Sequence, residues 1–168
     1  MNCNDLREEF IYGVKIEQIP SWSIFLTERL PRELEEDESV MSGYFYYREE
    51  VLVGYCLMSL MSGHTHTMHY LEISKEEQGK GVGSYIYKQM KKYYAEFILE
   101  PIGRGTYHFY LSLGAKPVCT HGGGMMLVSS QRAPSVVKED VFGSDLSSHV
   151  PNDDFVYVRD DWLAYDKL

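Results

Sequence analysis

The stretch LEISKEEQGKGVGSYIYKQM, Leu71–Met90, decides the fold of this chain. It begins in a strand expected over residues 67–74 and continues into a turn with glycines at 79, 81 and 83. Apolar residues then recur at helical spacing, which predicts a helix directly after the turn. These residues are Val82, Ile86, Met90, Tyr93 and Phe97.

The turn has the composition of an anion-binding cradle. Glycine lets the backbone turn tightly and lets a ligand approach it closely. The first turn of the following helix adds unbonded N–H groups and the positive end of the helix dipole. Nucleotide motifs fit poorly, because no lysine–serine pair of a GxxxxGK[ST] loop is present and GxGxxG from Gly79 ends on Ser84. The pattern that fits is Q-x-x-G-x-G, with Gln78, Gly81 and Gly83.

At these residues the sequence resembles the GNAT superfamily of acetyl-coenzyme A-dependent acyltransferases. In that family [QR]-x-x-G-x-[GA] follows the fourth strand and wraps the pyrophosphate of acetyl-coenzyme A. The resemblance implies one mixed α/β domain over residues 1–168, with a central, mostly antiparallel, splayed sheet of about six or seven strands flanked by helices. It also implies acetyl-coenzyme A as cosubstrate. The residues that would bind it are Leu71, Ile73, Gln78, Gly79, Lys80, Gly81, Val82, Gly83 and Ser84.

A second motif of the family lies farther along the chain. GNAT proteins often carry a helix with F-Y-x-x-x-G-F, and Phe109–Ala115 gives FYLSLGA, with Ala115 in place of the aromatic residue. In many members this tyrosine protonates the departing thiolate, a role that a pKa of about 10 permits. The resemblance therefore implies Tyr110 as the general acid. Packing remains the ordinary role of a tyrosine in a chain with 14 of them.

Direct acyl transfer also needs a base that takes a proton from the amine. The resemblance favours Glu100, at the end of the strand that follows the first helix. His69, nine residues before Gln78, ranks second, and Glu72 in the strand before the glycine turn ranks third. For each of the three, a surface or packing role is the alternative.

Other segments predict the remaining elements. Loose alternation indicates a strand over residues 10–19, and two further runs, 43–47 and 51–60, predict a hairpin across residues 48–50. The remaining expected elements are a helix opening at Pro20, a strand over 97–100, a helix over 106–113 closed by Gly114, paired strands over 116–120 and 125–129, a polar excursion over 131–152 and a strand over 155–158.

Composition excludes several classes of protein. The chain has 168 residues, 44% hydrophobic and 24% charged, which excludes disordered and fibrous chains and predicts one domain. The longest apolar run, Val51–Met61, is far shorter than the roughly 20 residues of a membrane helix, and no leader is apparent. Three widely spaced cysteines indicate reduced thiols in a cytoplasmic protein, with no disulfide and no metal site.

Charge and resemblance together predict the partners. A formal net charge of -9 repels phosphate backbones, so no nucleic acid is expected, and it favours a cationic acceptor. The resemblance implies an N-acetyltransferase in which a primary amine, from a small molecule or a peptide, attacks the thioester directly in a ternary complex. It also implies a homodimer paired through the last strands. The alternative is a catalytically silent acyl-coenzyme A-binding or protein-interaction module of the same fold.

Overall fold

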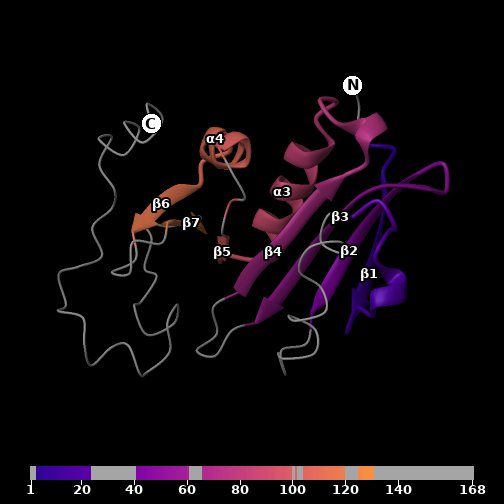
Figure 1. Ribbon diagram of the computed structural model, residues 1–168, viewed down its shortest axis with the longest axis horizontal. Helices are drawn as coiled ribbons and strands as arrows, with labels where there is room; N and C mark the ends of the chain where they lie inside the picture. The colour runs from indigo at the N-terminus through magenta and orange to yellow at the C-terminus, as the bar shows by residue number, and fades with distance from the viewer. Residues whose placement is uncertain are drawn as a thin grey trace. The chain divides into compact units, whose positions relative to one another are not determined.

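Antiparallel strands form the frame of the structure, a computed structural model that describes residues 3–23, 41–60, 66–99, 101, 104–119 and 125–130. The described chain divides into two units, Met1–Leu60 with Met68–Tyr93 and Met61–Thr67 with Tyr94–Leu168. In the first unit the strand order is β1-β2-β3-β4 (Figure 1). Their bounds are Arg7–Tyr12, Ser42–Arg48, Val51–Leu60 and His66–Ile73.

Aromatic and aliphatic side chains fill the core of the first unit. Phe45 on β2 and Tyr55 on β3 stack with ring centroids 5.9 Å apart, and both are almost completely buried. The same cluster contains Val14, Ile19, Met41, Leu57 and Tyr70. Burial of this apolar surface is the main force that holds the strands together.

Helix α3 (Val82–Tyr93) packs against β3 at a glycine. A Cβ atom on Gly54 would lie 2.8 Å from Ile73 Cδ1 and 3.0 Å from Ile86 Cδ1, so only glycine allows this approach. The predicted periodicity is confirmed for Val82, Ile86 and Met90, which are buried, and is wrong for Tyr93, which is 49% exposed. The helix ends at Tyr93, so Phe97 does not extend its apolar face. Phe97 lies in strand β5 (Glu96–Leu99), which confirms the strand predicted from residue 97.

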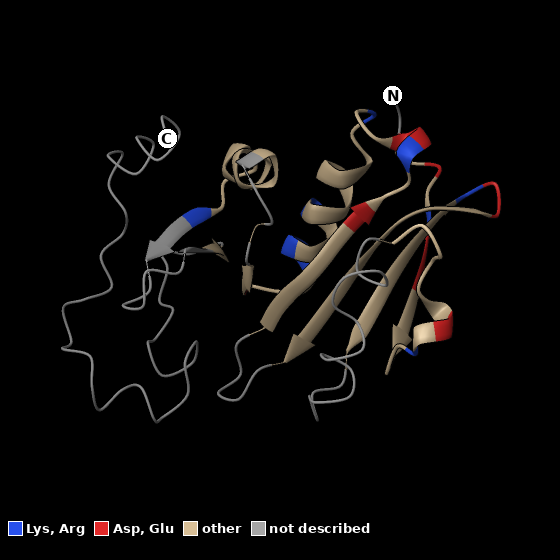
Figure 2. Ribbon diagram, viewed as in Figure 1, with Lys and Arg blue, Asp and Glu red and all other residues tan. Residues whose placement is uncertain are grey.

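The β2–β3 hairpin is confirmed, and its turn is shorter than expected. Arg48 pairs with Val51, so only Glu49 and Glu50 form the turn. Both have positive φ, 46° and 64°, which the two-residue turn of a twisted hairpin requires. Figure 2 shows the ribbon of this acidic tip in red, next to a basic position of the hairpin in blue.

The first strand differs from the prediction of a strand over residues 10–19. β1 ends at Tyr12, because Gly13 follows in the left-handed region with a φ of 68°. A short 3-10 helix, η1 (Ile16–Gln18), occupies the second half of the expected strand. The Gln18 side chain accepts a hydrogen bond of 2.9 Å from the Lys15 N–H, which stabilises this turn over extended chain.

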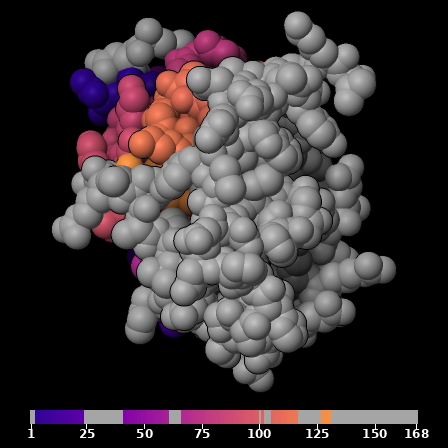
Figure 3. Space-filling view, turned by 90° about the vertical axis from the view of Figure 1, so that its left-hand side faces the viewer, coloured from indigo at the N-terminus to yellow at the C-terminus, as the bar shows by residue number. Residues whose placement is uncertain are grey.

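The second unit contains three strands and helix α4 (Arg104–Ser112) among its described residues. The strands are β5 (Glu96–Leu99), β6 (Lys116–Cys119) and β7 (Met125–Ser130), in the order β5-β7-β6 with antiparallel pairing. This confirms the expected pairing of 116–120 with 125–129. Gly114, with a φ of 89°, ends α4 as predicted. Side chains of the α4 region reach the surface in Figure 3 (orange).

The fold class is confirmed as mixed α/β, with largely antiparallel strands flanked by helices. Residues 21 and 22 form a turn, so the helix expected from Pro20 does not begin there, and the rest of that expected helix lies outside the described residues. The expected excursion over 131–152 and the expected strand over 155–158 lie outside them as well. No helix in the described part of the chain is long and apolar enough to cross a membrane.

Candidate functional site

The glycine turn lies between a short 3-10 helix, η2 (Lys75–Glu77), and α3. Gly79 and Gly81 have φ values of 73° and 85°, in the left-handed region that disfavours other residues by roughly 1–2 kcal/mol. No atom lies within 4 Å of a Cβ built on either glycine. The backbone conformation therefore demands glycine here, and the space above the turn is open to a ligand.

Helix α3 presents its N-terminus to this open turn. The first bond of the helix runs from the Tyr85 N–H to the Gly81 carbonyl, at 3.0 Å. The N–H groups of Val82, Gly83 and Ser84 lie in the first turn, where a helix supplies no carbonyl partner. No acidic side chain occupies this turn, so the positive end of the dipole is not neutralised by the helix itself. The arrangement suits a bound anion.

Two side chains of the predicted cradle hold the turn in place. The Gln78 side-chain amide donates a hydrogen bond of 3.1 Å to the Ile73 carbonyl, which ties the turn to the end of β4. Lys80 Nζ lies 3.1 Å from Glu77 Oε1 in an ion pair. Both contacts lie within the strand–turn–helix segment. The structure thus brings Ile73, Gln78 and the glycines together in one segment.

Glu72 belongs to a hydrogen-bonded chain of side chains. It accepts a hydrogen bond from the Tyr55 hydroxyl, which also lies 2.5 Å from Ser23 Oγ. Burial, and then the bond to Glu72, raise the pKa of Tyr55 far above its usual value. Tyr55 therefore remains protonated and keeps the carboxylate of Glu72 in place.

His69 also has a defined partner. Its Nε2 lies 2.5 Å from the hydroxyl of Ser59, a residue that is almost completely buried. This bond fixes the orientation of the imidazole on β4. His69 and Glu72 are therefore both held by neutral hydroxyl groups of β3.

Tyr110 lies on α4 in the second unit and is buried. Its carbonyl accepts bonds of 3.1 Å and 3.0 Å from the N–H groups of Leu113 and Ala115. Ala115 is buried too, so a small residue occupies the place of the usual aromatic. Glu100, the first-ranked base, lies outside the described residues.

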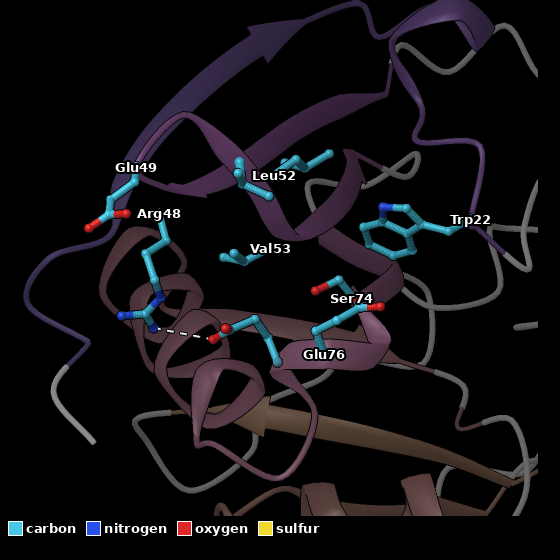
Figure 4. Close-up of a pocket in the computed structure, with 9 residues that line it drawn as sticks. Trp22, Arg48, Glu49, Leu52, Val53, Ser74 and Glu76 are labelled. Atoms are coloured by element: carbon cyan, nitrogen blue, oxygen red, sulfur yellow. Dashed lines mark hydrogen bonds and ion pairs between the residues drawn. The ribbon is translucent and has the colours of Figure 1, made fainter.

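A cavity of about 490 Å³ lies in the first unit beside η2, and no pattern in the sequence indicated it (Figure 4). It is bounded by the β2–β3 hairpin, by η2 and by Trp22. The cavity forms between segments that are distant in sequence, and local sequence patterns do not indicate such contacts. Trp22 was expected on the apolar face of a helix.

Among the described residues, no group of three or more His, Cys, Asp and Glu side chains is arranged to hold a metal. The His66 ring packs against the Tyr94 ring at an angle of 52°, with ring centroids 4.5 Å apart, and burial lowers the pKa of His66. Cys3 and Cys56 are free thiols, and burial raises the pKa of Cys56.

Comparison with known proteins identifies the family of the strand–turn–helix segment and its surroundings. Residues 4–115 match the acetyltransferase (GNAT) family. The chain belongs to the GNAT family. No curated protein sequence matches it.

Several solved structures resemble this chain at low sequence identity. The AtaT–AtaR complex bound to DNA is 18% identical, with a TM-score of 0.53, over 73% of this chain and 93% of that one. A mutant AtaT toxin bound to the C-terminus of AtaR and acetyl-CoA is 17% identical, with a TM-score of 0.52, over 75% and 93%. An acetyltransferase from Thermus thermophilus is 18% identical, with a TM-score of 0.47, over 57% and 67%. The likeness to the two toxin complexes shows the GNAT fold.

Proposed function

We propose that this GNAT chain transfers an acetyl group from acetyl-coenzyme A to a primary amine, by direct attack in a ternary complex. The observation that supports this most is the glycine turn at the N-terminus of α3. Gly79 and Gly81 leave the space above it open, and the first turn of α3 carries no acidic residue. These features fit a pyrophosphate, which helix N-termini bind through backbone N–H groups.

The remaining binding roles follow the strand–turn–helix order. The N–H groups of Val82, Gly83 and Ser84 would bond phosphate oxygens, and Gln78 would act indirectly by tethering the turn to Ile73. Leu71 and Ile73 on β4 would pair with the pantetheine arm through their backbones. A backbone N–H of this strand would also polarise the acyl oxygen.

Bound acetyl-coenzyme A supplies an acyl thioester, whose C–S bond breaks as the amine nitrogen bonds to the acyl carbon. The Tyr110 hydroxyl donates its proton to the leaving sulfur. Glu100, His69 or Glu72 takes the proton that the amine loses, either directly or through water. The hydroxyl groups of Ser59 and Tyr55 hold the second and third of these candidates in position.

The acceptor is a cationic primary amine, because a net charge of -9 steers cations toward the protein. The same charge disfavours nucleic acid. However, one fold relative is solved bound to DNA, so the fold alone does not exclude it. That relative is a complex with AtaR, which the acetyl-CoA-bound structure names as an antitoxin, so a protein partner is a further candidate. Pairing as a homodimer remains part of the proposal.

Thermal unfolding with and without acetyl-coenzyme A tests the cradle. At a hundred times its dissociation constant the ligand stabilises a fold by about 2.7 kcal/mol, or about 5–10 °C for this length. Gly81→Glu places a carboxylate in the cradle and should abolish the shift. Gly13→Glu is the matched control, because Gly13 also has a positive φ, of 68°, and lies outside the cradle.

An acetylation assay with a panel of primary amines then separates the two candidate functions. Transfer to an amine, lost in Gly81→Glu and retained in Gly13→Glu, supports the enzyme. A thermal shift with no acetylated amine supports the silent acyl-coenzyme A-binding module, which family membership does not favour. A wild-type protein that stays unshifted at millimolar acetyl-coenzyme A contradicts both.

A further inference from the structure

The cavity beside η2 lies next to the cradle in sequence and is lined by residues that the acyl transfer does not use. Its volume of about 490 Å³ is within the range of pockets that hold small organic ligands. Figure 4 shows Trp22, Ser74 and Glu76 on one side, Arg48 and Glu49 on the other, and Leu52 and Val53 between them. This arrangement combines a polar wall with an apolar floor.

Ser74 supplies a hydroxyl that has no partner within the described structure. It is the N-cap of η2, where a serine side chain normally accepts a backbone N–H, yet it makes no such bond. Ser74 is 7% exposed and lines the cavity. The hydroxyl makes no bond within the described structure, so it is available to accept a hydrogen bond from a ligand in the cavity.

The charges around the cavity favour a cation. The guanidinium of Arg48 is neutralised by Asp5 and by Glu77, whose Oε2 lies 3.3 Å from it. Glu76 and Glu49 also line the cavity, and neither forms an ion pair among the residues that the structure describes. Two carboxylates are therefore left to balance the charge of a ligand.

The indole of Trp22 favours a ligand that has an apolar or aromatic part. It is 40% exposed, and its ring lies 5.7 Å from the ring of Tyr55, which holds it in place. An exposed indole face attracts cations and packs against flat or apolar groups. Leu52 and Val53 extend this apolar surface.

We propose that this cavity binds an organic ammonium ion with an aromatic or aliphatic body. Its N–H groups donate to the Ser74 hydroxyl, Glu76 balances its charge, and its body packs against Trp22 and Leu52. The site is separate from the glycine cradle and binds without acetyl-coenzyme A. It therefore stands or falls independently of the proposed acyl transfer.

Fluorescence of Trp22 provides a direct reporter of occupancy. The chain has two tryptophans, so Trp162→Phe leaves Trp22 alone. Phenethylammonium is titrated into this protein without acetyl-coenzyme A, and calorimetry measures the same dissociation constant independently. Phenylacetate and phenethyl alcohol, of similar size but anionic and neutral, are expected to bind at least about tenfold more weakly. An acetyl-capped lysine amide, titrated in parallel, distinguishes a small amine from a peptide side chain as the source of the ammonium.

Two single substitutions locate the site. Ser74→Ala removes the hydroxyl and should weaken binding about twofold to tenfold. Glu76→Gln should weaken it about twofold to fivefold, and less at high salt. Glu17→Gln is the matched control, because Glu17 is also an exposed glutamate in the first turn of a 3-10 helix and does not line the cavity.

The proposal is overturned if phenethylammonium causes no saturable change up to about 10 mM by either method. It is also overturned if Ser74→Ala and Glu76→Gln bind as tightly as Glu17→Gln, since the amine would then lie elsewhere. Circular dichroism and thermal melting check that each variant is folded. Retained binding of the amine in Gly81→Glu would further show that this site and the cradle are distinct.

Discussion

The side-chain amide of Gln78 donates a hydrogen bond of 3.1 Å to the backbone carbonyl of Ile73. Gln78 is the first residue of the family motif, and its side chain bonds the protein backbone. Through it, the glycine turn is attached to the last residue of β4. The position of the turn depends on this bond as well as on the glycines.

Gln78→Leu is expected to weaken acetyl-coenzyme A binding about fivefold, as the loss of one hydrogen bond of about 1 kcal/mol predicts. Isothermal titration calorimetry measures the dissociation constant. Gln89→Leu is the control, because Gln89 is a glutamine of α3 whose side chain, among the described residues, bonds only an exposed lysine, Lys92. Equal affinities in the two variants would show that the tether does not support the cradle.

Gly54→Ala is expected to destabilise the fold by about 1–3 kcal/mol, the usual effect of overpacking. The added Cβ would lie 2.8 Å from Ile73 Cδ1 and 3.1 Å from the Glu72 carbonyl oxygen, which belongs to the backbone. Gly105→Ala makes the opposite test on α4, where a Cβ meets no atom within 4 Å. It should stabilise by about 0.5–1 kcal/mol. Urea unfolding measures both, and a neutral Gly54→Ala would contradict the close approach of α3.

Tyr110→Phe is expected to lower kcat about a hundredfold and leave the affinity for acetyl-coenzyme A unchanged, because only the proton donor is lost. Steady-state kinetics and calorimetry give the two quantities. Tyr107→Phe is closely matched, since Tyr107 and Tyr110 both lie on α4 and are 8% and 7% exposed. If both variants lose the same activity, the role of Tyr110 is packing.

His66 is expected to titrate below 6.5, because burial disfavours its charged form. As pH falls below 6.5, the unfolded chain binds a proton before the folded chain does, so this residue makes stability decrease with falling pH. Tyr94→Ala removes the ring that packs against His66 and should raise its pKa toward 6.5. NMR titration, with His66→Gln to assign the resonance, measures this. Titration of wild-type His66 at or above 6.5 would contradict the prediction.

Local patterns predicted the parts of the fold that local interactions determine. The glycine turn, the periodicity of α3 and the stop at Gly114 each depend on residues within a few positions, and all are present. The prediction of a strand over residues 10–19 was wrong, and the interactions that overturn it are also local. Its apolar spacing matched a strand, but the left-handed Gly13 and the bond from Lys15 to Gln18 end the strand early.

The contacts of the candidate site depend on distant residues and were not predicted. Glu72 and His69 were identified by position along β4, but their partners, Tyr55 and Ser59, come from another strand. The cavity beside η2 is lined by residues from 22 to 77. Sequence order gives no measure of such proximity. It indicates which residues carry chemistry, and the fold determines which of them meet.

The turn of the β2–β3 hairpin has a consequence for how the sequence balances stability against charge. Glu49 and Glu50 both adopt left-handed backbone angles, which asparagine and glycine would adopt with less strain. An Asn-Gly turn would relieve that strain and remove two negative charges, one of them from the rim of the cavity. Selection for stability alone would favour the exchange. Replacing the two glutamates would therefore raise the stability of the fold and weaken the negative electrostatic potential around the cavity.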